Sequence, residues 1–96
     1  MKVYFTFGQI HRHRVNGLLL DRDCVGVIYA HSHAAARVLA FEWFDGKFHN
    51  SYDDQEMPPG SDKFKHLMSF FPRGLVHINP PPKPTLWQRL VKWWHA

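Results

Sequence analysis

The sequence has a single cysteine, Cys24, and no long uninterrupted run of apolar residues. One cysteine excludes an intrachain disulfide framework and the zinc modules that are built from several cysteines. A helix that spans a bilayer needs about 18 consecutive apolar residues, which the chain does not offer, and residues 1–8 lack the apolar segment and cleavage site of a secretory signal. We therefore expect no transmembrane segment and a cytoplasmic location.

Catalytic motifs are missing as well. The sequence contains no Gly-x-Ser-x-Gly motif, phosphate-binding loop, His-Glu-x-x-His pattern or paired-carboxylate spacing, and Asp53 and Asp54 are interpreted as turn residues. Cys24 lies in an alternating apolar segment, a setting typical of a buried and unreactive thiol. We therefore expect a protein with no enzymatic activity, no catalytic residue and no cofactor.

The composition is that of one globular domain. The 96 residues are 45% hydrophobic and include 8 Phe, 4 Trp and 3 Tyr, enough apolar material for one core but not for two. Apolar and β-branched runs predict strands at 3–7, 24–30 and 47–52, with a fourth strand or edge extension at 74–79. The turn signal Asn16-Gly17 favours a hairpin loop within residues 9–23. The predicted fold class is α+β, with a small mixed or antiparallel sheet of three to four strands around a β-β-α-β core.

Two helices are expected within this domain. Ser32 is the predicted N-cap of one long apolar helix from about His33 to Phe44. Because that helix is apolar on nearly all sides, we expect both of its sides to be covered. Ser61 is the predicted N-cap of a short helix that ends before Pro72.

A third helix is expected at the C-terminus. A proline-rich spacer, 80–84, separates the α+β domain of residues 1–79 from an amphipathic helix at 85–96, whose start Thr85-x-x-Gln88 matches a capping box. Its apolar side chains, among them Trp87, Leu90 and Trp94, fall on one face at helical spacing. Docking on the protein's own core, packing on a partner and insertion at a membrane interface all stay open for this helix.

Histidine is unusually frequent, with 8 residues in the chain. Two pairs, His11 with His13 and His31 with His33, have the spacing that places both imidazoles on one side of an extended backbone. Neither pair has a cysteine or carboxylate at ligand spacing. These four residues are the candidate metal ligands, but the pattern favours solvated histidines and no metal site is predicted.

Charge is distributed as alternating blocks along the chain. Residues 42–56 are acidic on balance, whereas 1–41 and 57–96 are basic, and the formal net charge is +4. Such a mixture suits a protein partner at least as well as a nucleic acid, because acidic groups near a phosphate backbone oppose binding.

Two segments are candidate contact surfaces for a partner. One is the run of donors His11, Arg12, His13 and Arg14, which follows a strand, and the other is the apolar face of the terminal helix at Trp87, Leu90 and Trp94. A nucleic acid would instead be contacted through basic side chains, and the candidates are Arg12, Arg14, Lys63, Lys65, Arg89 and Lys92.

A set of motifs in the first 54 residues resembles a known group of proteins. The motifs are Phe5-Thr6-Phe7-Gly8, His11 and His13, Val25 to Tyr29, Ala35-Ala36-Arg37, Phe41-Glu42-x-Phe44, and Lys47-Phe48 followed by Tyr52-Asp53. In this order they resemble small, uncharacterised bacteriophage-encoded proteins. The chain departs from that pattern in its long loop with Leu18-Leu19-Leu20 and in Phe48, where tryptophan is common. The resemblance implies a phage or prophage origin and a β-β-α-β core, and it implies no chemistry.

We therefore expect a non-enzymatic phage-type protein that binds a host protein in the host cytoplasm to inhibit or redirect it. An anti-defence, anti-CRISPR-like inhibitor is the special case. The alternatives are a small nucleic-acid-binding module and a histidine-based metal-dependent protein. Because the long helix and the terminal helix both offer apolar surface, we also expect a homodimer.

The histidine content predicts a dependence of stability on pH. Imidazoles gain protons between about pH 7.5 and 5.5. A histidine that is buried in its neutral form gains its proton more easily in the unfolded state, so acid favours unfolding. We expect a lower melting temperature at pH 5.5 than at pH 7.5 in thermal unfolding. An equal or higher value would show that the histidines are exposed or paired with acids such as Asp53 and Glu56.

Overall fold

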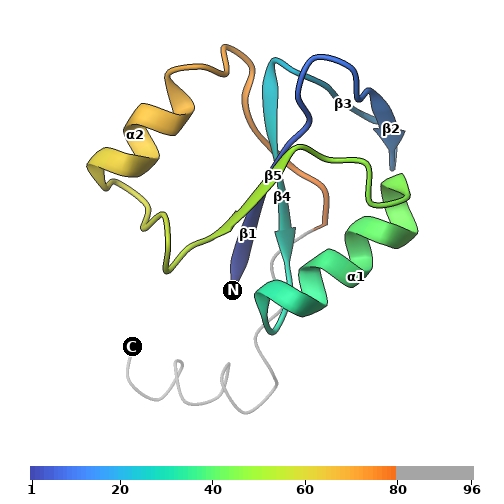
Figure 1. The fold of residues 1–96 in the computed structure, drawn as a ribbon, viewed down its shortest axis with the longest axis horizontal. Helices are drawn as coiled ribbons and strands as arrows, with labels where there is room; N and C mark the ends of the chain where they lie inside the picture. The colour runs from blue at the N-terminus through green and yellow to red at the C-terminus, as the bar shows by residue number, and fades with distance from the viewer. Residues whose placement is uncertain (80–96) are drawn as a thin grey trace, which may run out of the picture.

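The computed structural model describes residues 1–79 of the chain (Figure 1). The elements are β1 (Lys2–Thr6), β2 (His13–Val15), β3 (Leu18–Leu20), β4 (Cys24–Tyr29), α1 (His33–Phe44), β5 (Asn50–Asp53), α2 (Asp62–Met68) and β6 (Gly74–His77). The α+β class predicted from the sequence is confirmed. The predicted spacer and terminal helix, with Trp87, Arg89, Leu90, Lys92 and Trp94, lie outside the described residues. Within residues 1–79 no helix is long and apolar enough to cross a bilayer.

Four strands form one mixed sheet in the order β5-β1-β4-β6. β1 is antiparallel to both of its neighbours, whereas β4 and β6 are parallel. β1 and β4 lie in the centre because they are nearly continuous apolar runs that are buried on both faces. β5 begins at Asn50 and not at Lys47 as predicted, since the segment before it first closes the end of α1.

The segment between β1 and β4 forms a second, two-stranded sheet of β2 and β3. Asn16 and Gly17 both have positive φ angles, 50° and 77°, as a tight hairpin turn requires. Val15 and Leu20 of this hairpin are buried in the core. The sequence located the turn, but these two strands were not predicted because each is only 3 residues long.

The main sheet is a central layer between the two helices (Figure 1). Alternating side chains of β1 and β4 point to opposite faces, which we name the α1 face and the α2 face. The α1 face includes Val3, Phe5 and Ile28, packed with Ala36, Ala40 and Phe44 of α1. The α2 face includes Tyr4, Val25 and Val27, packed with Phe64 and Met68 of α2.

Both described helices begin at the predicted caps. The Ala35 backbone N–H donates to Ser32 Oγ at 3.0 Å, and the Phe64 N–H donates to Ser61 Oγ at 3.2 Å. α1 ends at Phe44 and is capped by Asp45, which has a left-handed conformation and whose N–H donates to the Ala40 carbonyl.

The expectation that both sides of α1 are covered is not met within residues 1–79. Every fourth residue from Ala36 to Phe44 faces the sheet and is buried. The opposite side points away from the sheet, and there Val38 and Phe41 are 59% and 60% exposed. A helix on one face of a sheet can bury only one stripe, so the additional apolar residues remain at the surface.

Gly26 in β4 leaves no room for a side chain. A Cβ atom there would lie 2.9 Å from Ile78 Cδ1 and 3.2 Å from Phe7 Cζ. We expect Gly26→Ala to lower the free energy of unfolding by about 1 to 3 kcal/mol, measured by urea denaturation. Ile78→Val removes the clashing Cδ1 atom. We therefore expect the double variant to lose less free energy of unfolding than the sum of the losses in the two single variants. Strictly additive losses would contradict this account.

Candidate functional site

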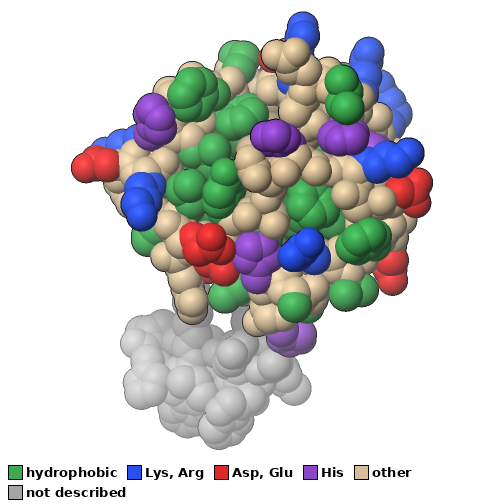
Figure 2. Space-filling view, in the orientation of Figure 1, with side chains coloured by type: hydrophobic (Ala, Val, Ile, Leu, Met, Phe, Trp, Pro, Cys, Tyr) green, Lys and Arg blue, Asp and Glu red, His purple; other side chains and the backbone are tan. Residues whose placement is uncertain are grey.

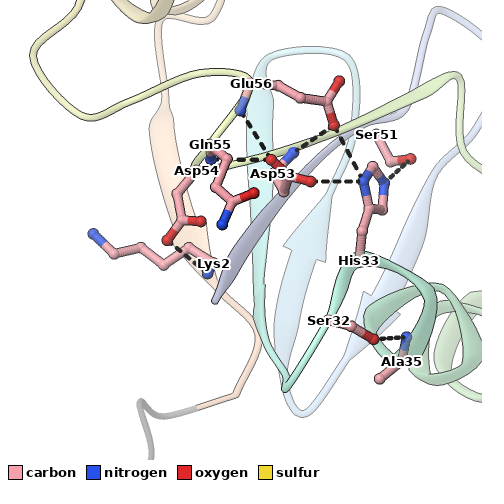
Figure 3. A network of polar contacts seen from close by, with 9 residues as sticks. All are labelled: Lys2, Ser32, His33, Ala35, Ser51, Asp53, Asp54, Gln55 and Glu56. Atoms are coloured by element: carbon pink, nitrogen blue, oxygen red, sulfur yellow. Dashed lines mark hydrogen bonds and ion pairs between the residues drawn. The ribbon is translucent and has the colours of Figure 1, made fainter.

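A cluster of polar side chains lies where the start of α1 meets the edge strand β5 (Figure 3). Asp53 pairs with Val3 and Ser51 pairs with Phe5 in the β1–β5 ladder. Because Val3 and Phe5 belong to the α1 face, Ser51 and Asp53 also project to that face. His33 is the first residue of α1, so the helix cap at Ser32 places its imidazole directly over them.

The His33 ring joins three side chains. Its Nε2 lies 2.8 Å from Ser51 Oγ. Its Nδ1 lies 3.2 Å from Asp53 Oδ2 and 3.2 Å from Glu56 Oε1. Asp53 is buried and Glu56 is exposed, so the cluster extends from the edge of the core to solvent.

The Asp53 carboxylate is fixed by the turn that follows β5. Its Oδ1 accepts the backbone N–H groups of Gln55 at 3.0 Å and Glu56 at 2.9 Å. The hydrogen bond from Glu56 is the main reason why the pKa of Asp53 is below its ordinary value; the Gln55 and His33 contacts also lower it, and burial opposes them. The predicted turn is therefore correct, and its first residue also holds the cluster together.

The contacts follow the order of a Ser-His-Asp hydrolase triad: hydroxyl to Nε2, and Nδ1 to carboxylate. The setting of the serine differs from that of a hydrolase nucleophile. Ser51 lies inside a regular edge strand and not on a sharp strand-to-helix turn. The hollow next to the cluster is lined by His33, Ala34 and Arg37 and not by Ser51. The arrangement is better suited to holding a proton or a cation between His33 and the two carboxylates.

The four histidines considered as metal ligands have different surroundings. His13 Nε2 lies 2.9 Å from the Lys47 carbonyl, and its ring packs at 5.5 Å from that of Phe44. His11 stacks on His13 at 6.3 Å, and His31 is exposed. Of the four, His33 is the one that joins other potential ligands within residues 1–79. No histidine within residues 1–79 is buried, and His33 pairs with Asp53 and Glu56, so the premise of the lower melting temperature at pH 5.5 is not met there and the alternative of acid-paired histidines applies to His33.

The run His11 to Arg14 is divided between two roles. Arg12 and Arg14 are exposed, and their role in contacting a partner stays a prediction. His13 instead anchors the loop to the end of α1 through its contact with the Lys47 carbonyl. His13 and Arg14 are consecutive residues of β2, so their side chains point to opposite sides.

The basic candidates do not form one surface in the described residues. Arg12 and Arg14 lie on or beside the β2–β3 hairpin, which packs against the α1 face. Lys63 and Lys65 lie on α2, on the opposite side of the sheet (Figure 1). Cys24 is fully buried, and burial raises the pKa of its thiol, which agrees with the predicted unreactive cysteine.

The sequence analysis named Asp53 and Glu56 as acids that could pair with histidines, but it did not assign them to His33, and it missed Ser51. The i, i+2 spacing of Ser51 and Asp53 on a predicted strand was a usable signal, because it places both side chains on one face. The spacing does not reveal that α1 covers that face, since His33 is 18 to 20 residues away in the sequence.

Removing the charge of Asp53 is expected to reduce stability in a pH-dependent way. The folded pKa of Asp53 lies below the ordinary value of the carboxyl group, so the stabilising contribution of Asp53 is complete above the unfolded pKa and is lost as the pH falls through the folded pKa. We expect Asp53→Asn to cost about 1 to 3 kcal/mol at pH 7. The difference from the wild type should shrink as denaturation is measured at pH values falling from about 5 toward 2.

The exposed Glu42, which makes no ion pair with any of residues 1–79, is the matched control, and Glu42→Gln should change stability by about 0.5 kcal/mol or less. A difference between Asp53→Asn and the wild type that stays constant over the whole pH range would contradict the assignment.

Comparison of the chain with protein-family models, with curated proteins and with solved structures gave no match. The function therefore has to be inferred from the chain's own residues. The features that can support an inference are the exposed apolar side of α1 and the His33 cluster.

Proposed function

We propose that the protein acts by binding another protein, with the outward side of α1 as the main contact. The observation that carries this proposal is the exposure of Val38 and Phe41 on a helix whose inner side is already packed on the sheet. Together with the exposed Ala34 they form a stripe at i, i+4 and i+7, which we name the α1 surface. Figure 2 shows hydrophobic side chains at the molecular surface over α1.

A hollow of about 630 Å³ adjoins this stripe and gives a partner side chain a place to insert. Its lining is largely apolar and consists of Met1, Tyr29, Ala30, His31, Ala35, Val38 and Leu39. Val38 belongs to both the stripe and the hollow. An aromatic or aliphatic anchor that enters such a hollow and excludes water is typical of the energetic centre of a protein interface.

Charged groups beside the stripe indicate the chemistry of the partner. Arg37 is exposed and makes no ion pair with any of residues 1–79. Glu42, five residues further along α1, is also exposed. The complementary surface therefore presents an apolar anchor with an acidic group opposite Arg37, since matched charges select the partner and orient it.

The resemblance of residues 5–54 to phage-encoded proteins supports a host protein as this partner. Binding then inhibits or redirects the host protein, and an anti-CRISPR-like inhibitor of host defence is the special case. No catalytic step is required for this function.

The same apolar surface also supports self-association. A second copy that covered Val38 and Phe41 would remove both from water, and the favourable free energy of such burial is roughly 25 cal/mol per Å². A homodimer and a complex with a host protein are alternatives for this surface, because one copy of α1 cannot contact both at once.

Nucleic-acid binding remains the second candidate through the exposed Arg12 and Arg14. It has less support than protein binding because Lys63 and Lys65 lie on the other side of the sheet. A gel-shift series in rising salt tests it, since binding through phosphates weakens steeply with salt.

The proposal predicts that Val38→Asp abolishes partner binding without unfolding the protein. Val38 is largely exposed, so the stability should change by about 0.5 kcal/mol or less. Ile10→Asp is the matched control, because Ile10 is an apolar residue that is 87% exposed and lies outside the α1 surface. Wild type and both variants are immobilised and used to capture proteins from a bacterial lysate, followed by quantitative mass spectrometry.

The proposal is supported if one protein is captured by the wild type and by Ile10→Asp but not by Val38→Asp. With purified components, that protein should bind Val38→Asp at least tenfold more weakly than the wild type. Light scattering measures the mass in solution of the three proteins and so distinguishes self-association from binding of another protein. If the α1 surface pairs with itself, Val38→Asp should reduce the mass to that of one chain. Equal capture and equal mass for both variants would refute a contact through α1.

A further inference from the structure

We propose that His33, Asp53 and Glu56 bind a divalent transition-metal ion, with Zn²⁺ as the best-fitting ion. The three donor atoms are His33 Nδ1, a carboxylate oxygen of Asp53 and one of Glu56, and all lie within 4.8 Å of one another. They come from the start of α1, the end of β5 and the turn after it (Figure 3). The inference is independent of the proposed protein contact, which uses the outward side of α1.

The spacing of the donors matches the size of a zinc site. Zinc binds nitrogen and oxygen ligands at about 2.0 to 2.2 Å in a tetrahedral arrangement, which places neighbouring ligand atoms about 3.3 to 3.5 Å apart. His33 Nδ1 lies 3.2 Å from Asp53 Oδ2 and 3.2 Å from Glu56 Oε1. The ion therefore fits between these atoms with small adjustments. Glu56 Oε1 also accepts the Asp53 backbone N–H at 3.4 Å, a long contact that holds the carboxylate near His33 and that the exposed Glu56 side chain can adjust.

The partners behind the ligands hold them in a binding orientation. Ser51 Oγ, at 2.8 Å from Nε2, can accept a hydrogen bond from the Nε2–H group, and in that tautomer the lone pair of Nδ1 is directed at the two carboxylates and available to an ion. Asp53 Oδ1 is occupied by two backbone N–H groups, which leaves Oδ2 for the ion. Such contacts to the non-ligating atoms are a general feature of metal sites in proteins.

Charge and donor type favour a transition metal over magnesium or calcium. Two carboxylates that converge on one imidazole leave a net negative charge when the ring is neutral, and a divalent cation offsets it. Imidazole nitrogen suits zinc, copper, iron and nickel, whereas magnesium and calcium prefer oxygen ligands alone. Three protein ligands leave one tetrahedral position, and the exposure of Glu56 gives water access to it.

The experiment is a calorimetric titration of the metal-free protein with Zn²⁺, and separately with Mg²⁺. We expect one Zn²⁺ per chain and at least tenfold weaker binding of Mg²⁺. Glu56→Gln should weaken Zn²⁺ binding tenfold or more, whereas Glu42→Gln, which alters an exposed glutamate of α1, should leave it unchanged. His33→Gln should abolish the site, and His31→Gln, two residues before it, should not.

Folding of each variant is checked by circular dichroism, and Glu56→Gln is the decisive variant because Glu56 is exposed. Zn²⁺ should raise the melting temperature of the wild type and of Glu42→Gln, but not that of Glu56→Gln. Equal Zn²⁺ affinity in Glu56→Gln and Glu42→Gln would overturn the proposal. So would loss of binding in His11→Gln with retention in His33→Gln, which would place the ion at the stacked His11 and His13 rings.

Discussion

The antiparallel pairing of β1 with β5 is the constraint on which the His33 cluster depends. It sets Asp53 opposite Val3 and Ser51 opposite Phe5, so the polar side chains of an edge strand share a face with the apolar core. A shift of one residue would turn both polar side chains to the α2 face and away from His33. The same shift would turn Tyr52, which now pairs with Tyr4 of the α2 face, to the α1 face.

α1 serves the core and the surface with different sides of the same helix. On the inner side, Ala36 and Ala40 are small enough for the helix to approach the sheet, and Phe44 closes the end of the core against Phe5 and Phe7. The outer side keeps Val38 and Phe41 in contact with water. The exposure of these apolar side chains is unfavourable in free energy, and the fold of residues 1–79 does not remove this cost. A binding partner would remove it, which is why the helix and not the polar loop is the stronger candidate contact.

Residue type alone did not distinguish structural histidines from those at a site. His13 and His33 are each the second residue of a His-x-His pair, yet His13 contacts a backbone carbonyl and aromatic rings. His33 instead meets a hydroxyl and two carboxylates. The two rings differ because their partners come from distant positions in the sequence. The spacing of ligands within a short segment cannot predict such partners.

The sequence by itself determined the α+β class, the central strands, both described helix caps and the burial of Cys24, because propensity, capping and apolar runs are local. Two short strands escaped prediction, since 3 residues carry too little periodicity. Only the tertiary structure decided that Ser51 and Asp53 lie beneath His33 and that one side of α1 is left open. Sheet order, register and helix placement follow from packing between segments far apart in the chain, and that information is not contained in any local pattern.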